Sequence, residues 1–237
     1  MELIEKKENS IVFKADIEDS LANAIRRYVN QIPILAIDEV EISKNGSALY
    51  DESLAHRIGL IPLKMDKTMS EKTTAVLKLA SNKEGMIKSE ELKGSIEPAF
   101  KEIPITYLNK GQEVELLAYV RAGKGIEHVK FSPGLMFYRH VYEIVSSKNF
   151  AEKIKQLYNC KITEKSGKAI IIDDGKEEIT DVIEGLADRL KEKIEINQKN
   201  NLIISLESFG QISVKDIFIK SVEALKKDLT EISKKIK

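Results

Sequence analysis

The first clear pattern of hydrophobic and polar positions predicts a helix followed by a strand. Beginning at Asp19, apolar residues such as Leu21 and Ile25 recur every three or four positions, which is the spacing of one helical face. Pro33 ends this helix because proline lacks an amide hydrogen and restricts the residue before it. Apolar and charged residues then roughly alternate over residues 34–43, as in a half-buried strand.

Neighbouring patterns extend this order on both sides. Residues 10–17 alternate and predict a strand that leads into the helix. Residues 54–63 predict a short helical turn, with Gly59 in its C-terminal capping position and Pro62 just beyond it. The chain is therefore predicted to begin with a strand, a helix, a strand and a short helix.

The middle of the chain predicts a mostly β domain. Residues 104–120 carry an alternating apolar pattern after a turn at 109–111, and this stretch is interpreted as a hairpin. Gly123 and Gly125 follow it. They lack the long glycine-to-lysine spacing of a phosphate-binding loop, so we expect a turn there.

From Asn149 the pattern changes to helix, hairpin and helix. Asn149 and Glu152 can form a capping box, the strands within 162–173 are predicted to fold back around 165–168, and Thr180 can cap the second helix. The predicted buried positions of the two helices are Phe150, Ile154, Leu157, Ile183, Leu186 or Ala187, Leu190 and Ile194.

The last part of the chain predicts a strand at 201–208, a turn at 209–210 and a long helix that starts at Ser213. The apolar positions of that helix follow a heptad spacing: Phe218, Val222, Leu225, Leu229, Ile232 and Ile236. By itself this pattern fits packing within the chain and packing against another chain equally well.

Composition and charge exclude several classes of protein. Hydrophobic residues at 42% and charged residues at 32% describe a soluble globular protein. The 38 basic and 38 acidic residues cancel, so the chain lacks the positive excess of a protein that grips nucleic acid by itself. Any DNA contact is expected to be indirect, through partners. No apolar run approaches the roughly 20 residues that span a bilayer, so no membrane contact is expected.

Cysteine and carboxylate chemistry is sparse. Cys160 is the only cysteine, so the chain cannot assemble a disulfide, a cysteine-rich zinc site or an iron–sulfur cluster by itself, which fits a reducing cytoplasm. Asp173 and Asp174 precede Gly175. They could be read as a magnesium-binding pair, but a turn is favoured because Asp-Gly is a common turn dipeptide.

Candidate catalytic residues are also lacking. His56, His128 and His140 have no second histidine at metal-binding spacing, and we expect them to make local hydrogen bonds. No carboxylate cluster of the kind that holds two metal ions is present in the pattern. We therefore predict no catalytic and no metal-ligating residue in this chain.

Four segments resemble the family that contains the D-type subunit of archaeal RNA polymerase, the third-largest subunit of eukaryotic RNA polymerase II and the N-terminal domain of bacterial alpha. The first three lie at 20–27, 36–42 and 51–63. The fourth, within 121–134, is similar to the family's second-domain motif of a glycine pair before Glu-His and a lysine. The last two segments hold the motif residues Leu54, His56, Arg57, Gly59, Pro62, Gly123, Gly125, His128 and Lys130.

The resemblance implies an α+β fold with a discontinuous alpha-NTD-like dimerisation domain. Residues 1–45 and 197–237 are expected to form that domain, 46–147 an inserted mostly β domain, and 148–196 a small ferredoxin-like α/β insert. The helix that begins at Asp19 and the final helix are expected to lie side by side. In several archaeal relatives the small insert holds an iron–sulfur cluster through four cysteines, which this chain does not have, so no cofactor is expected.

The resemblance also implies a non-catalytic, cytoplasmic assembly subunit of archaeal DNA-dependent RNA polymerase. The chain is expected to pair with subunit L, and the pair to form a platform for the small subunits N and P and the second-largest and largest subunits. One arginine of its first helix is expected to contact the second-largest subunit. The predicted partner-binding residues are Leu21, Ile25, Arg26, Arg27, Tyr28, Phe218, Val222, Leu225, Leu229 and Ile232. A heterodimeric interaction scaffold outside transcription is the alternative.

Overall fold

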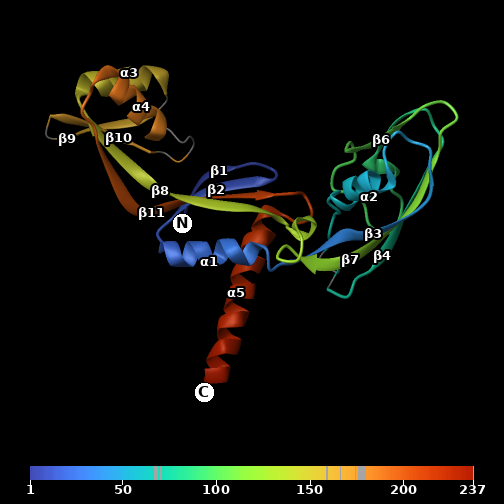
Figure 1. Cartoon of the computed structure of the whole chain (residues 1–237). Coiled ribbons are helices and arrows are strands. Elements are labelled where there is room, and N and C mark those ends of the chain that lie inside the picture. The colour runs from blue at the N-terminus through green and yellow to red at the C-terminus, as the bar shows by residue number, and fades with distance from the viewer. Residues whose placement is uncertain are drawn as a thin grey trace. The chain divides into compact units, whose positions relative to one another are not determined.

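The chain divides into two compact units (Figure 1). The first unit comprises Met1–Asn23 and Met136–Leu206, and the second comprises Ala24–Leu135 and Glu207–Lys237. The division falls within helix α1 (Asp19–Val29). The structure is a computed structural model, and it describes residues 1–66, 69, 71–158, 160–165, 167–173, 175 and 180–236.

The first unit is built on a six-stranded sheet in the order β1-β2-β11-β8-β10-β9, with two helices. Its strands are β1 (Glu2–Lys6), β2 (Ser10–Ala15), β8 (Gly134–Ser146), β9 (Lys161–Lys165), β10 (Lys168–Ile172) and β11 (Glu195–Ser208). Its helices are α3 (Lys148–Leu157) and α4 (Thr180–Leu190). The predicted strand within residues 10–17 and the predicted helix, hairpin and helix are confirmed, but the strand is not the first of the chain, because β1 precedes it.

Part of this unit has the topology of a ferredoxin-like motif. The elements follow one another as β8, α3, β9, β10, α4 and β11, and the four strands lie in the order β11-β8-β10-β9, with β10 antiparallel to both neighbours. This is the split βαβ arrangement. The predicted insert at 148–196 holds the two helices and the hairpin, and the long strands β8 and β11 complete the motif around it.

The helices of this unit differ in detail from the prediction. Helix α3 is capped by Ser147, whose Oγ accepts a hydrogen bond from the Phe150 amide at 3.3 Å, so the predicted cap at Asn149 was wrong. Leu157 is 65% exposed and Leu190 is 49% exposed, because each closes the last turn of its helix, away from the core. The core contains Ile144, Phe150, Ala151, Ile154, Cys160, Ala169, Ile171, Ile183 and Ala187.

The second unit combines a three-stranded antiparallel sheet, β3-β7-β4, with a two-stranded pair, β5-β6. Its elements are β3 (Pro33–Asn45), α2 (Asp51–Gly59), β4 (Ala75–Ser81), β5 (Gly85–Lys88), the 3₁₀ turn η1 (Ser89–Glu91), β6 (Pro104–Leu108), β7 (Val114–Lys124), the 3₁₀ turn η2 (Val129–Phe131) and α5 (Val214–Ile236). One continuous core joins α2 to both sheets and includes Leu35, Ile37, Leu54, Ile58, Leu77, Ile87, Ile105 and Leu116.

The hairpin predicted over 104–120 was wrong in its pairing. The turn exists, because Gln112 donates its amide to the Asn109 carbonyl at 3.0 Å and Gly111 has a φ of 81°. However, β6 pairs with β5, while β7 pairs with β3 on one edge and β4 on the other. Both edges of β7 are therefore occupied, and β6 finds its partner elsewhere.

Two predictions about glycines also need correction. Gly59 is the last residue of α2 and is not left-handed; the C-cap is Leu60, with a φ of −91° in the right-handed region. Gly123 lies inside strand β7, and the turn begins only at Gly125. In the predicted turns at 165–168 and 173–175, Ser166 and Asp174 lie outside the described residues.

In the described part of the chain, no helix is both long and apolar enough to cross a membrane.

Candidate subunit-interaction surfaces

Helix α5 is buried at its start and exposed along its apolar stripe. Val214 and Ile217 are buried, and Ser213 caps the helix by accepting the Asp216 amide at 3.1 Å. The predicted start of the helix at Ser213 is confirmed. In the C-terminal half, Leu229 is 58% exposed and Ile232 is 52% exposed. The complete stripe is graded: Phe218 and Leu225 are half-buried, whereas Val222, Leu229, Ile232 and Ile236 are exposed.

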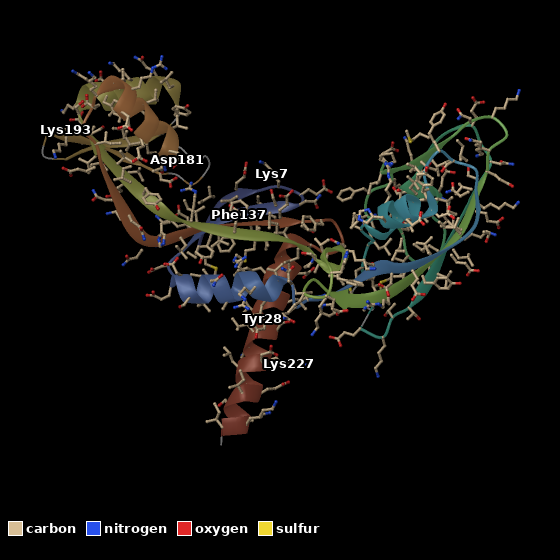
Figure 2. All side chains as sticks on the ribbon, viewed as in Figure 1. Lys7, Tyr28, Phe137, Asp181, Lys193 and Lys227 are labelled. Carbon is tan, nitrogen blue, oxygen red and sulfur yellow. The ribbon has the colours of Figure 1, made fainter. Side chains whose placement is uncertain are left out.

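Helices α1 and α5 meet within the second unit, as the resemblance implies. The Tyr28 hydroxyl donates a hydrogen bond to Asp228 Oδ2 at 2.8 Å, although the two residues are far apart in sequence. Figure 2 shows Tyr28 on α1 beside α5, where Lys227 is labelled. This hydrogen bond raises the pKa of the Tyr28 hydroxyl above its usual value, because ionisation would place two negative charges together.

The predicted stripe on α1 faces two directions. Ile25 and Val29 are buried inside this chain, whereas Leu21 is 44% exposed and Tyr28 is half-buried. The inward face therefore includes Val29, which the sequence pattern did not single out. Arg26 is exposed on the same helix, as is Arg27, so both arginines remain at the surface of this chain.

The motif in α2 serves mainly to build the fold. Leu54 is fully buried in the core of the second unit. Arg57 Nη2 donates to the Pro104 carbonyl at 3.0 Å, and the Pro62 carbonyl accepts the Ala99 amide at 2.8 Å. These two bonds connect α2 to β6, and the segment after α2 to the segment before β6, within the same chain. His56 is exposed.

The second motif fixes the loop after β7. His128 Nδ1 accepts the Lys130 amide at 3.2 Å and so caps η2. A Cβ on Gly123 would lie 2.7 Å from the ring of Phe131, which is fully buried. A Cβ on Gly125 would lie 2.6 Å from Asn30 Oδ1. The buried ring therefore leaves no room for a side chain at position 123, whereas a side chain at position 125 would require the Asn30 side chain to move.

Asp38 is the electrostatic centre of this loop and was not singled out from the sequence. Its carboxylate receives Arg121 Nε and Lys130 Nζ, each at 2.7 Å. Both cations also lie over the Phe131 ring, the Arg121 guanidinium carbon 4.7 Å and Lys130 Nζ 5.2 Å from the ring centroid. The hydrogen bond from Arg121, followed by that from Lys130, holds the pKa of the Asp38 carboxyl below its usual value.

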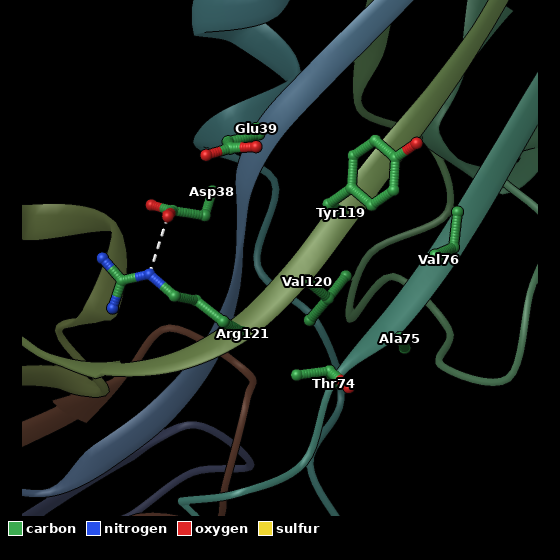
Figure 3. A pocket seen from close by; sticks show the side chains of 8 residues that line it. All are labelled: Asp38, Glu39, Thr74, Ala75, Val76, Tyr119, Val120 and Arg121. Atoms are coloured by element: carbon green, nitrogen blue, oxygen red, sulfur yellow. Dashed lines mark hydrogen bonds and ion pairs between the residues drawn. The ribbon is translucent and has the colours of Figure 1, made fainter.

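The outer face of the β3-β7-β4 sheet carries a shallow hollow of about 430 Å³ beside this network (Figure 3). Its apolar part includes Val76, which is 48% exposed, and Tyr119, which is 37% exposed. The Tyr119 hydroxyl donates to Glu41 at 2.9 Å. The lining residues are Asp38, Glu39, Thr74, Ala75, Val76, Tyr119, Val120 and Arg121.

A second hollow, of about 380 Å³, lies beside α5 in the same unit. Its apolar lining comes from Ile32, Pro33, Met65, Met69 and Ala224, and its charged rim from Glu71, Lys220, Glu223 and Lys227. Such a mixed lining suits an apolar side chain flanked by polar groups.

The remaining candidate residues make local contacts. His140 lies near Asp19, with Nε2 3.2 Å from Oδ1. Asp173 is paired with Arg139 and accepts the Gly175 amide at 2.9 Å. Among the described residues, no group of three or more His, Cys, Asp and Glu side chains is arranged to hold a metal ion.

Comparisons with known proteins agree with these motifs. A family model described as the RNA polymerase Rpb3/RpoA insert domain matches residues 40–136. The chain is 37% identical over 169 residues to DNA-directed RNA polymerase subunit Rpo3 of Thermococcus kodakarensis, and the aligned part covers 65% of each chain. It is 34% identical over 191 residues to Rpo3 of Pyrococcus furiosus, covering 76% of this chain and 71% of that relative.

A eukaryotic relative extends the match. The chain is 27% identical over 282 residues to DNA-directed RNA polymerase II subunit rpb3 of Dictyostelium discoideum, covering 98% of this chain and 93% of the relative. All these relatives are subunits of DNA-directed RNA polymerases. The chain therefore belongs to the family of RNA polymerase subunits that contains archaeal Rpo3 and eukaryotic Rpb3.

Proposed function

We propose that this chain is a non-catalytic assembly subunit of a cytoplasmic DNA-directed RNA polymerase. The observation that carries the proposal is the exposed apolar stripe of α5 in a chain of this family. Because roughly half of each residue is already covered within this chain, covering the rest of Leu229 and Ile232 with a partner would contribute about 1 kcal/mol each. The stripe is therefore a strong source of association free energy.

The partner at this stripe is the small subunit L. In this proposal, α1 and α5 belong to an alpha-NTD-like dimerisation domain, and the partner lays an equivalent helix along α5 in heptad register. The contact between Tyr28 and Asp228 supports the proposal, because it joins the two chain ends that such a discontinuous domain requires. The hollow beside α5 offers space for a partner side chain at the edge of the seam.

The paired subunits then serve as a platform. The small subunits N and P, the second-largest subunit and the largest subunit bind to it, and DNA is met only through the assembled complex. Nucleotidyl transfer belongs to the large subunits, and this chain carries no cofactor. Cys160 supports the last point, because it is buried among apolar side chains of the α3 and α4 layer. No observation favours a scaffold outside transcription.

Production of the chain with and without subunit L tests the proposal. We expect aggregates or mixed oligomers from the chain alone and a one-to-one heterodimer when both chains are present, because the α5 stripe is then covered. Sedimentation velocity distinguishes the two states. A stable, well-folded monomer that does not bind subunit L in the same experiment would contradict the proposal.

A further inference from the structure

The buried residues of α5 all lie near the start of the helix. They are Val214, Ile217 and Ser221. Every position from 226 to 236 is exposed. The C-terminal part of the apolar stripe therefore lies on a section of the helix that the rest of the chain does not bury.

Packing beside this section is incomplete. Ile32 and Pro33 line the hollow of about 380 Å³ beside α5 together with Ala224 and Lys227 of the helix. Segments with few buried apolar contacts move at a lower free-energy cost than segments in a core. The direction of the outer part of α5 therefore depends on contacts that are made beyond its buried start.

Helix α1 supplies such a contact. The Tyr28 hydroxyl donates to Asp228 Oδ2 at 2.8 Å. Asp228 lies roughly 20 Å along the helix from Val214, given the rise per residue of an α-helix. A bond at that distance from the buried start limits sideways movement of the helix more effectively than a bond close to it.

Of the two residues in this bond, Tyr28 is the more firmly placed. Its neighbours Ile25 and Val29 are buried, and Tyr28 itself is half-buried. Asp228 is exposed. The tyrosine is thus the fixed end of the bond, and the outer part of α5 is the element that the bond holds.

We propose that Tyr28 is a positioning residue for subunit pairing: through Asp228 it holds the outer part of α5 in the direction in which Leu229 and Ile232 meet the helix of subunit L. This inference rests on the proposed function. Without the bond, α5 samples other directions, and the fraction of molecules ready to bind the partner falls. The apparent affinity falls by the same fraction. Tyr28 acts here through α5, by a bond within its own chain.

Competition between variant and unaltered chains for a limiting amount of subunit L tests the proposal. Both chains are produced together with tagged L, and mass spectrometry of the isolated heterodimers gives the share of each. We expect Tyr28→Phe to take a share about threefold to tenfold smaller, because a hydrogen bond contributes on that scale. Tyr119→Phe is the matched control: it removes a similar bond, from Tyr119 to Glu41 at 2.9 Å, and should compete as the unaltered chain does. An undiminished share for Tyr28→Phe would overturn the proposal.

Variants of the acceptor show whether Tyr28 acts through Asp228. Asp228→Ala should reduce the share about as much as Tyr28→Phe, and the double variant should reduce it no further, because all three lose the same bond. Asp228→Asn keeps an acceptor oxygen and should restore most of the share. Effects that multiply in the double variant, or an Asn variant as weak as the Ala variant, would overturn the proposal.

The rate at which the heterodimer releases L separates positioning from direct contact. Once L is bound, its own contacts hold α5, so Tyr28→Phe should release L at the unaltered rate in a chase with excess labelled L. Faster release would show that the tyrosine touches the partner, since lost contacts act mainly on dissociation, and would overturn the proposal. Capture of L by the unaltered chain in the same experiments shows that the proposed function stands even where the Tyr28 variant has no effect.

Discussion

The motif residues of the second unit and the apolar stripe of α5 differ in how far the chain itself buries and contacts them. Leu54, Gly123 and Lys130 are used inside the chain, in the core, beneath a ring and in an ion pair. Leu229 and Ile232 are apolar and in register, yet they remain exposed. These motif residues stabilise the fold of the chain itself. The surface that a partner can cover is identified instead by the apolar residues that remain exposed.

The largest effect is expected from substitutions in the exposed stripe of α5. The Leu229→Asp, Ile232→Asp double variant should lose at least about a thousandfold in affinity for subunit L, because pairing would bury two unpaired carboxylates. Circular dichroism should be unchanged, since both side chains are exposed in this chain. Lys234→Asp, placed on the opposite side of the heptad, is the matched control. Equal affinity of the double variant and the unaltered chain would show that the seam lies elsewhere.

A smaller effect is expected at a motif residue that packs within the chain. Gly123→Ala should lower the free energy of unfolding by about 1–3 kcal/mol, because the new Cβ would lie 2.7 Å from the buried Phe131 ring. Denaturant unfolding of the heterodimer with L measures the change. Gly185→Ala is the control: a Cβ at this position of helix α4 meets no atom within 4 Å, so that variant should be as stable or slightly more stable. A neutral Gly123→Ala would mean that the contact with Phe131 relaxes freely.

The smallest effect is expected in how the stability contributed by Asp38 depends on pH. Because the folded state lowers the pKa of Asp38, its carboxylate stabilises the fold above the unfolded pKa of about 3.9 and loses this effect as pH falls through the lower folded value. Asp38→Asn should therefore be less stable than the unaltered chain at pH 7, and the gap should close below about pH 4. Urea midpoints across this range provide the measurement. Glu39→Gln, at the exposed neighbouring position, is the control and should change the stability at pH 7 little.

The order of elements could be predicted because each element has its own local pattern of apolar and polar residues. The helix from Asp19, the strand from residue 34 and the final helix from Ser213 appear within a few residues of the predicted positions. Pairing was less accessible. The turn at 109–111 was visible in the sequence, but the partner of β6 depends on which strands occupy the edges of β7, and no local pattern encodes that.

The candidate surfaces were predictable to a similar degree. The heptad of α5 left packing within the chain and packing against a partner equally open, and the structure adds which of its members are exposed. The network around Asp38 was missed because the register of β3 against β7 shifts between Ile37 and Glu39, so that Asp38 lies at an irregularity. The carboxylate then meets Lys130, a residue distant in sequence, and spacing alone gives no sign of this pair.

The ferredoxin-like part of the first unit has a consequence for how this chain can vary. Strands β8 and β11 are neighbours in the sheet, although the two helices and the hairpin separate them in sequence. The polypeptide thus makes an excursion and returns next to the strand it left. Because β8 and β11 are neighbours in their own right, a change in the length of the turns within that excursion does not alter which strand lies beside β11, whereas loss of β10 would expose one edge of β8.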